Sequence, residues 1–218
     1  MATTPERAHL ALEVARQIRP QVDRLAVYVN GDLKGTKKWP GDWLIHPVGD
    51  LAAAGKFYAI PDSGFHLTVD DDLVYPEGYV ASLQQACDRH GGVVSYHGSI
   101  IPDGLIRSYF RDRIKYPILR TVEADQRVHI AGTGCMGWYP GRQASRPAWG
   151  VHMLPPFMVD IHFARWCKRF GVKRTVIAHN EGDFTHREID IAKTLGGKFY
   201  NCDTIHTWYV NQTDWERL

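Results

Sequence analysis

Residues 66–80 read HLTVDDDLVYPEGYV, and the interpretation of the whole chain starts from this stretch. The apolar and β-branched residues of 66–69 predict a buried strand that runs directly into the aspartates of 70–72. After a turn, the spacing of apolar residues in 79–90 predicts a helix, which the glycine pair that follows would end. A strand, a loop and a helix in this order are typical of an α/β protein.

The three aspartates predict a cation site. Adjacent carboxylates repel one another, which is costly unless a positive charge lies beside them. Because side chains alternate along a strand, we expect Asp70 and Asp72 on one face and Asp71 on the other. Oxygen ligands suit Mn²⁺ or Mg²⁺, which bridge protein carboxylates to substrate phosphates. Asp72 is therefore the leading metal ligand and Asp70 its partner; the alternative is a solvated acidic turn.

The rest of the chain continues the alternation of helices and strands. Further strands are expected at 24–30, 43–45, 93–101, 128–136 and 173–178, and further helices at 5–18 and 156–170. Residues 103–126 are rich in charged and aromatic residues and are expected to cross over the sheet as a lid. This order predicts an α/β fold with a mixed, mainly parallel sheet flanked by helices. Such sheets bind ligands at the carboxyl ends of their strands.

The composition is that of an ordinary globular protein. The chain has 218 residues, 44% hydrophobic and 23% charged, so one domain over 1–218 is the expectation. A formal charge of +2, spread along the chain, gives no sign of a polyanion-binding stripe. The four cysteines are widely spaced, which favours neither a zinc knuckle nor a disulfide framework. Without a signal peptide or a membrane span, a soluble protein of the cytoplasm is expected.

Seven segments together resemble the GT-A fold of glycosyltransferases. These are MATTPER (1–7), RLAVYVNG (24–31), AAGKFY (53–58), HLTVDDDLVYPEGYV (66–80), SYHG (95–98), HIAGTGCM (129–136) and MVDIHFARW (158–166). The resemblance covers about residues 1–180 and is greatest to bacterial family 2-like enzymes that act on surface polysaccharides. The DDD, GTG and DI segments are also similar to the exostosin-type catalytic domain. The resemblance implies a donor nucleotide and metal half, 1–100, and an acceptor half, 101–218.

On the donor side, the resemblance implies a set of residues that contact the nucleotide sugar. These are Thr3, Thr4, Pro5, Arg7, Asn30, Lys56, Asp70 and Asp71. The free N–H groups at the start of a helix and the charge of Arg7 suit a phosphate, and Lys56 can reach a phosphate or the base as a point charge. The alternatives are helix capping for 3–7, a plain turn at Asn30 and a surface lysine at 56.

On the acceptor side, the small residues Gly132 and Gly134 permit close approach of a ligand, and Thr133 can donate a hydrogen bond to it. The alternative is a bulge without a ligand. The resemblance implies that Asp160 is the catalytic residue, either as the general base of an inverting enzyme or as a group that orients the sugar or acceptor. Its alternative is a favourable charge at a helix start. The resemblance also places His179 near the metal or the phosphates. The alternative is that His179 is an ordinary surface histidine.

The expected reaction is metal-dependent transfer of a sugar from a nucleoside diphosphate sugar, UDP-linked in the favoured case, to an acceptor hydroxyl. The acceptor is expected to be a glycan, with a modified nucleobase of DNA as another candidate. A sugar nucleotidyltransferase would need a glycine-rich phosphate loop near the N-terminus, which this sequence lacks. A non-catalytic carbohydrate or nucleic-acid binding module remains the alternative from a different class, with aromatic residues as stacking platforms. Its candidate platforms are Trp39, Trp43, Trp138, Tyr139 and Trp149.

Overall fold

The fold was analysed in a computed structural model, which describes residues 1–31, 44–45, 49–60, 63–141, 157–187 and 202–218. Its helices are η1 (Pro5–Arg7), α1 (Ala8–Ile18), η2 (Arg19–Gln21), η3 (Ala52–Phe57), α2 (Tyr79–His90), α3 (Tyr109–Asp112), α5 (Val159–Arg169) and α7 (Asp203–Asn211). The strands of the N-terminal part are β1 (Ala2–Thr3), β2 (Val27–Val29), β3 (Leu44–Ile45), β4 (His66–Val69) and β5 (Leu73–Val74). The later strands are β6 (Val93–Ser95), β7 (Gly98–Ile100), β8 (Ile114–Tyr116), β9 (Gln126–Arg127), β10 (Ile130–Ala131), β11 (Cys135–Trp138), β12 (Arg174–Val176) and β13 (Thr185–His186).

A five-stranded sheet in the order β4-β11-β6-β12-β9 forms the middle of the molecule. Strand β11 is antiparallel to both β4 and β6, whereas β12 is parallel to β6. Strands β4, β6 and β12 therefore run in one direction, and their carboxyl ends lie at the same edge of the sheet. The aspartates of 70–72 follow β4 at this edge, and residues 132–134 precede β11 there.

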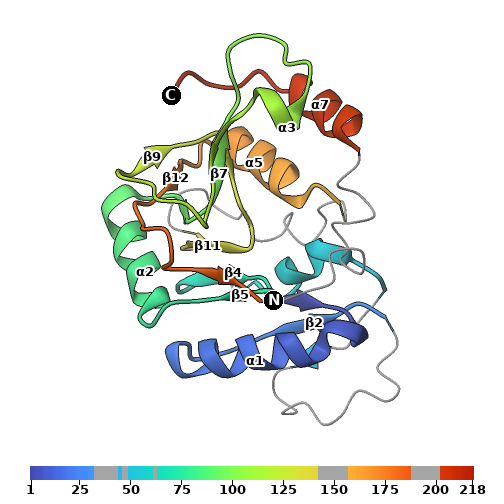
Figure 1. The fold of residues 1–218 in the computed structure, drawn as a ribbon, viewed down its shortest axis with the longest axis vertical. Helices are drawn as coiled ribbons and strands as arrows, with labels where there is room; N and C mark the ends of the chain where they lie inside the picture. Colours follow the sequence, from blue (N-terminus) through green and yellow to red (C-terminus); the bar gives the residue numbers. More distant parts are fainter. Residues whose placement is uncertain (32–43, 46–48, 61–62, 142–156, 188–201) are drawn as a thin grey trace.

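Smaller sheets flank the central one. Strands β1, β2 and β3 are parallel and carry α1 beside them (Figure 1). Strands β10, β7 and β8 form an antiparallel sheet, and β13 pairs with β5. The β6–β11 ladder and the β7–β10 ladder are neighbours in sequence, but the pairing is interrupted at 96–97 and 132–134. Main-chain hydrogen bonds from Tyr96 to Cys135 and from Gly132 to His97 still join the chain across this interruption, and the amide of Asp70 bonds to the Gly134 carbonyl.

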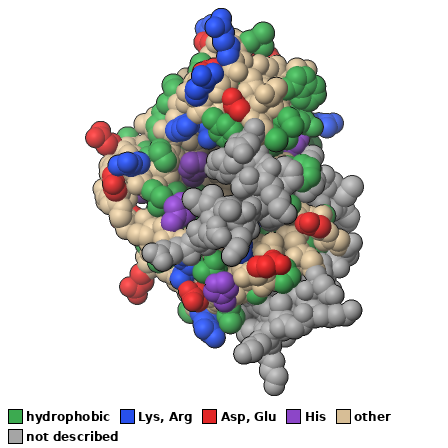
Figure 2. Space-filling view, turned by 45° about the vertical axis from the view of Figure 1, so that its right-hand side comes forward, with side chains coloured by type: hydrophobic (Ala, Val, Ile, Leu, Met, Phe, Trp, Pro, Cys, Tyr) green, Lys and Arg blue, Asp and Glu red, His purple; other side chains and the backbone are tan. Residues whose placement is uncertain are grey.

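Helices and strands enclose three clusters of buried apolar side chains within the described residues. The first includes residues of α1, α2, β2 and β6, and the second lies between the central sheet and α5. The third joins α5 to α3 and α7, which lie side by side in Figure 1. On the face shown in Figure 2, basic and acidic side chains are interspersed. None of the described helices is long and apolar enough to cross a membrane.

The mixed α/β class and most of the expected elements are confirmed. The prediction of a mainly parallel sheet is wrong, because antiparallel pairs outnumber parallel pairs among the described strands. The single strands expected at 93–101 and 128–136 are also wrong. Each is broken into two short strands, since the chain bends at His97 and at the Gly132–Gly134 segment. Residues 103–126 contain α3 and β8, and β8 extends the β7 sheet.

Candidate functional site

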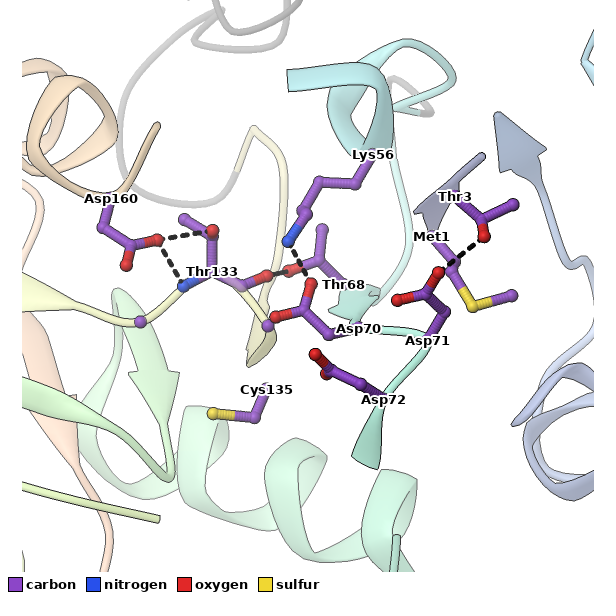
Figure 3. A network of polar contacts seen from close by, with 12 residues as sticks. Met1, Thr3, Lys56, Thr68, Asp70, Asp71, Asp72, Thr133, Cys135 and Asp160 are labelled. Atoms are coloured by element: carbon purple, nitrogen blue, oxygen red, sulfur yellow. Dashed lines mark hydrogen bonds and ion pairs between the residues drawn. The ribbon is translucent and has the colours of Figure 1, made fainter. Parts of the chain in front are cut away.

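The candidate site lies beyond the carboxyl end of β4. Figure 3 shows Asp70 and Asp72 directed toward the same space, while Asp71 points away toward Thr3 on β1. The side-chain alternation expected from the sequence is thus confirmed for the triplet. Asp70 and Asp72 retain 39% and 22% exposure of their side chains, whereas Asp71 retains 7%. The first two are therefore the carboxylates that a ligand can reach.

Asp71 ties the triplet to the N-terminal segment. Its Oδ2 accepts a hydrogen bond from the Thr3 hydroxyl at 2.5 Å, and its Oδ1 pairs with the Arg7 guanidinium. Arg7 also lies 3.2 Å from Oδ2 of Asp72. Burial raises the pKa of Asp71 to about 6, although Arg7 and Thr3 act in the opposite direction. Thr3 and Asp71 thus hold the site together, and Arg7 bridges to the side that faces a ligand.

Lys56 contributes the second cation. It belongs to η3, its side chain is only 4% exposed, and its ammonium pairs with Oδ1 of Asp70. Burial alone would lower the pKa of Lys56, but Asp70, with Asp160 and Asp72, raises it above its ordinary value. Burial alone would raise the pKa of Asp70, and Lys56 with Arg7 lowers it instead. Both members of this pair are therefore charged at neutral pH.

The backbone around Asp70 is fixed by the loop that precedes β11. The amide of Asp70 donates to the Gly134 carbonyl at 3.0 Å, and the Tyr75 hydroxyl donates to the same carbonyl at 2.7 Å. A Cβ at Gly134 would overlap the Asp70 carboxylate, so a larger residue here would displace that side chain. The hydroxyl of Thr68 donates to the Thr133 carbonyl at 2.6 Å. The loop and the end of β4 are therefore joined by several hydrogen bonds.

Asp160 contacts this loop from the first turn of α5. Its Oδ1 accepts hydrogen bonds from the main-chain amide of Thr133 at 2.9 Å and from the Thr133 hydroxyl at 2.5 Å. Gly134 is next to Thr133 and touches Asp70, so Asp160 and Asp70 lie on either side of this loop (Figure 3). Gly132 lies against His97, since a Cβ there would come within 2.7 Å of the imidazole ring.

Among the described residues of this cluster, carboxylates outnumber lysine and arginine side chains. In the described part of the chain, the ion pairs of the triplet are with Arg7 and Lys56, whereas Asp160 adds a fourth carboxylate. Burial and the neighbouring Asp70 raise the pKa of Asp72, as expected for carboxylates that repel each other. A divalent cation would relieve this repulsion. Mg²⁺ and Mn²⁺ need only one or two protein carboxylates when phosphate oxygens and water complete the coordination, and Asp70 with Asp72 fits that requirement.

His179 is not brought to the carboxylates. Its Nδ1 lies 2.8 Å from the Ile177 carbonyl and its Nε2 lies 3.3 Å from the Pro117 carbonyl, so both nitrogens face hydrogen-bond acceptors. Among the described residues, no three histidine, cysteine or acidic side chains are grouped closely enough to hold a metal ion. A metal site on Asp70 and Asp72 thus depends on further ligands from a substrate. The ring of His179 instead packs against Tyr96 and Phe184.

The remaining predicted residues have mainly structural contacts. Asn30 donates to the Thr3 and Ala52 carbonyls at 3.2 and 3.0 Å and accepts from the Leu51 amide, which fixes η3 against β1. Thr4 precedes η1 without a capping hydrogen bond from its side chain, and Pro5 begins η1. Trp138, a candidate stacking platform, is buried against Phe57 and Phe163. Trp39, Trp43 and Trp149 lie outside the described residues.

Tyr75 is the residue that the sequence did not single out. It directly follows β5, and its buried hydroxyl links the backbone of Asp70 to that of Gly134. A tyrosine at this position gives no signal of such a bond in the sequence.

Comparison of the sequence with protein-family models and with curated proteins finds no match.

Proposed function

We propose that this protein is a metal-dependent glycosyltransferase of the GT-A type, which transfers a sugar from a nucleoside diphosphate sugar to an acceptor hydroxyl. One observation carries the proposal. The carboxylates of Asp70 and Asp72 open onto the same space as Lys56, and Asp160 lies across the Thr133–Gly134 loop from them (Figure 3). This arrangement supports the resemblance of the seven sequence segments, because residues far apart in the chain meet where such an enzyme needs them.

The donor is proposed to bind with its diphosphate over Asp70 and Asp72. Arg7 and Lys56 supply positive charge from two sides of this position, and each is held by a carboxylate that fixes its direction. A cation bound by Asp72 and Asp70 would supply neutralisation of the charge that develops on the departing diphosphate. The uracil base is favoured for the donor, giving UDP-sugars as the first compounds to test.

The acceptor is proposed to bind between Asp160 and the donor, in the space that Lys56 also faces, since the charge of Asp160 acts on Lys56. The two hydrogen bonds from Thr133 fix one carboxylate oxygen and thereby orient the other. If the reaction inverts the anomeric centre, Asp160 takes the proton of the acceptor hydroxyl. If the reaction retains it, Asp160 orients the acceptor and a phosphate oxygen takes the proton. A glycan is the proposed acceptor, and a modified nucleobase of DNA is the second candidate.

A thermal-shift screen with nucleoside diphosphates, with and without Mn²⁺, tests this proposal. UDP with Mn²⁺ is expected to raise the melting temperature by about 5 °C at saturating concentrations, and UDP alone to raise it much less. Asp72→Ala should abolish the metal-dependent part, whereas Asp23→Ala, at an exposed position between α1 and β2, should retain it. A non-catalytic binding module would instead keep its ligand affinity in the Asp72→Ala variant and in EDTA.

A further inference from the structure

Lys56 is an unusual lysine because its charged end is enclosed while its backbone is fixed. Its side chain is 4% exposed, and η3 is packed so closely that a Cβ at Gly55 would come within 2.5 Å of the Tyr28 ring. Asn30 adds hydrogen bonds to the chain at the start of η3. Helix η3 therefore has little freedom to shift, and the ammonium of Lys56 can change its partner only through rotation of its flexible side chain.

The ammonium of Lys56 uses the carboxylate that a metal would need. It pairs directly with Oδ1 of Asp70, and the charges of Asp160 and Asp72 also act on it. An ammonium and a divalent cation repel each other strongly at short range, above all in a partly buried site. The cation can therefore bind Asp70 tightly only when another negative group replaces Asp70 as the ion-pair partner of Lys56.

A diphosphate provides such a group. Its oxygens form charge-assisted hydrogen bonds with an ammonium, and they are also good ligands for Mg²⁺ or Mn²⁺. When diphosphate and cation arrive together, Lys56 can exchange Asp70 for a phosphate oxygen, and Asp70 becomes available to the cation. Either ligand alone leaves a repulsion in place, between Lys56 and the cation or between the carboxylates and the diphosphate.

We infer that Lys56 is a resident counter-ion of Asp70 that makes the divalent cation and the nucleoside diphosphate bind cooperatively. This inference rests on the proposed function, since it concerns the same donor site. It goes further by giving Lys56 a positioning role that couples the two ligands. By linkage, UDP must tighten Mn²⁺ binding by the same factor by which Mn²⁺ tightens UDP binding.

The test measures binding rather than turnover, by electron paramagnetic resonance of free Mn²⁺ and by calorimetry with UDP. In the unaltered protein, UDP should tighten Mn²⁺ binding about tenfold or more, within the range usual for coupled sites. In Lys56→Met, Mn²⁺ alone should bind about tenfold more tightly than in the unaltered protein, and the gain from UDP should shrink correspondingly. Lys56→Arg keeps the positive charge and should keep most of the cooperativity.

Lys173→Met is the matched control, because Lys173 is exposed next to the amino end of β12, at the opposite edge of the sheet. It should bind Mn²⁺ and UDP as the unaltered protein does. The inference is overturned if Lys56→Met, folded by circular dichroism, binds Mn²⁺ alone no more tightly than the unaltered protein. It is also overturned if Lys56→Arg loses the cooperativity to the same extent as Lys56→Met. If the Met variant is unstable, Lys56→Arg is compared with the unaltered protein instead, and loss of its cooperativity overturns the inference.

Failure of the proposed function gives a different result. In that case the unaltered protein shows no Mn²⁺-dependent binding of UDP, ADP, GDP, CDP or dTDP, and no comparison of variants is needed. If the unaltered protein binds both ligands, but Lys56→Met shows the same Mn²⁺ affinity and the same cooperativity as the Lys173→Met control, only the role of Lys56 is wrong.

Discussion

The carboxylate of Asp160 accepts two hydrogen bonds from one residue, Thr133, through its main-chain amide at 2.9 Å and its hydroxyl at 2.5 Å. Thr133 in turn belongs to the loop whose next residue, Gly134, holds the backbone of Asp70. The two ends of the proposed site are therefore linked through the backbone of two adjacent residues. A substitution that removes a hydrogen bond of Thr133 should therefore alter the orientation of the Asp160 carboxylate first.

Replacement of Thr133 by Val should lower the turnover of a UDP-sugar about tenfold, because one of the two bonds that orient Asp160 is lost. The main-chain bond remains, and the KM for the donor should hardly change. Thr133→Ser should restore most of the rate. Thr175→Val is the matched control, since the buried Thr175 hydroxyl has no hydrogen-bond partner among the described residues. Equal turnover in all three variants would argue against a positioning role for Thr133.

The pH dependence of stability should carry a contribution from Asp71. Its pKa in the folded protein is raised from 3.8 to about 6, so the folded state binds this proton more tightly than the unfolded state. The stability that it contributes is complete below about pH 4 and is lost as the pH rises through about 6. The loss should be on the order of 3 kcal/mol.

Asp71→Asn isolates this contribution. The free energy of unfolding of the unaltered protein, minus that of the variant, should fall as the pH is raised from about 4 to about 7. Urea denaturation of both proteins at several pH values measures the difference, in which other titrating groups largely cancel. A difference that stays constant or rises over this range would contradict the environment described for Asp71.

The ion pair between Arg174 and Glu216 should stabilise the fold. The Arg174 side chain is 1% exposed, and it pairs with Glu216, which is about one-third exposed at 35%. Glu216→Ala leaves a buried guanidinium without its carboxylate and should cost about 3 kcal/mol in chemical denaturation. Glu181→Ala removes an exposed pair with Arg120, and it should cost less than about 1 kcal/mol. Equal effects of the two substitutions would contradict the proposed difference.

The local elements could be predicted from the sequence because their signals are local. The apolar run before Asp70 predicts β4, and the helical spacing of 79–90 predicts α2. The alternation of side chains expected for a strand also separates Asp71 from Asp70 and Asp72, although β4 itself ends at Val69. These features need no knowledge of distant partners, so a pattern in a few residues is enough.

The pairing of strands could not be predicted in the same way. Strand β11 lies between β4 and β6 in the opposite direction, and nothing in its own residues indicates these neighbours. The bonds from Thr133 to Asp160 and from Tyr75 to Gly134 likewise join residues that lie far apart in the sequence. His179 follows β12 as expected, but its ring is turned toward backbone carbonyls, which depends on the packing of residues around 117.

The most direct test of the proposed function is the release of UDP from UDP-sugars by the purified protein, measured with Mn²⁺ and with excess EDTA. We expect release in Mn²⁺ and none above background in EDTA. Asp72→Ala should reduce the rate at least about a hundredfold, in line with the loss of an electrostatic contact to the leaving group, and Asp23→Ala should have the rate of the unaltered protein. Release that continues undiminished in EDTA, or in the Asp72→Ala variant, would contradict the metal-dependent site on Asp70 and Asp72.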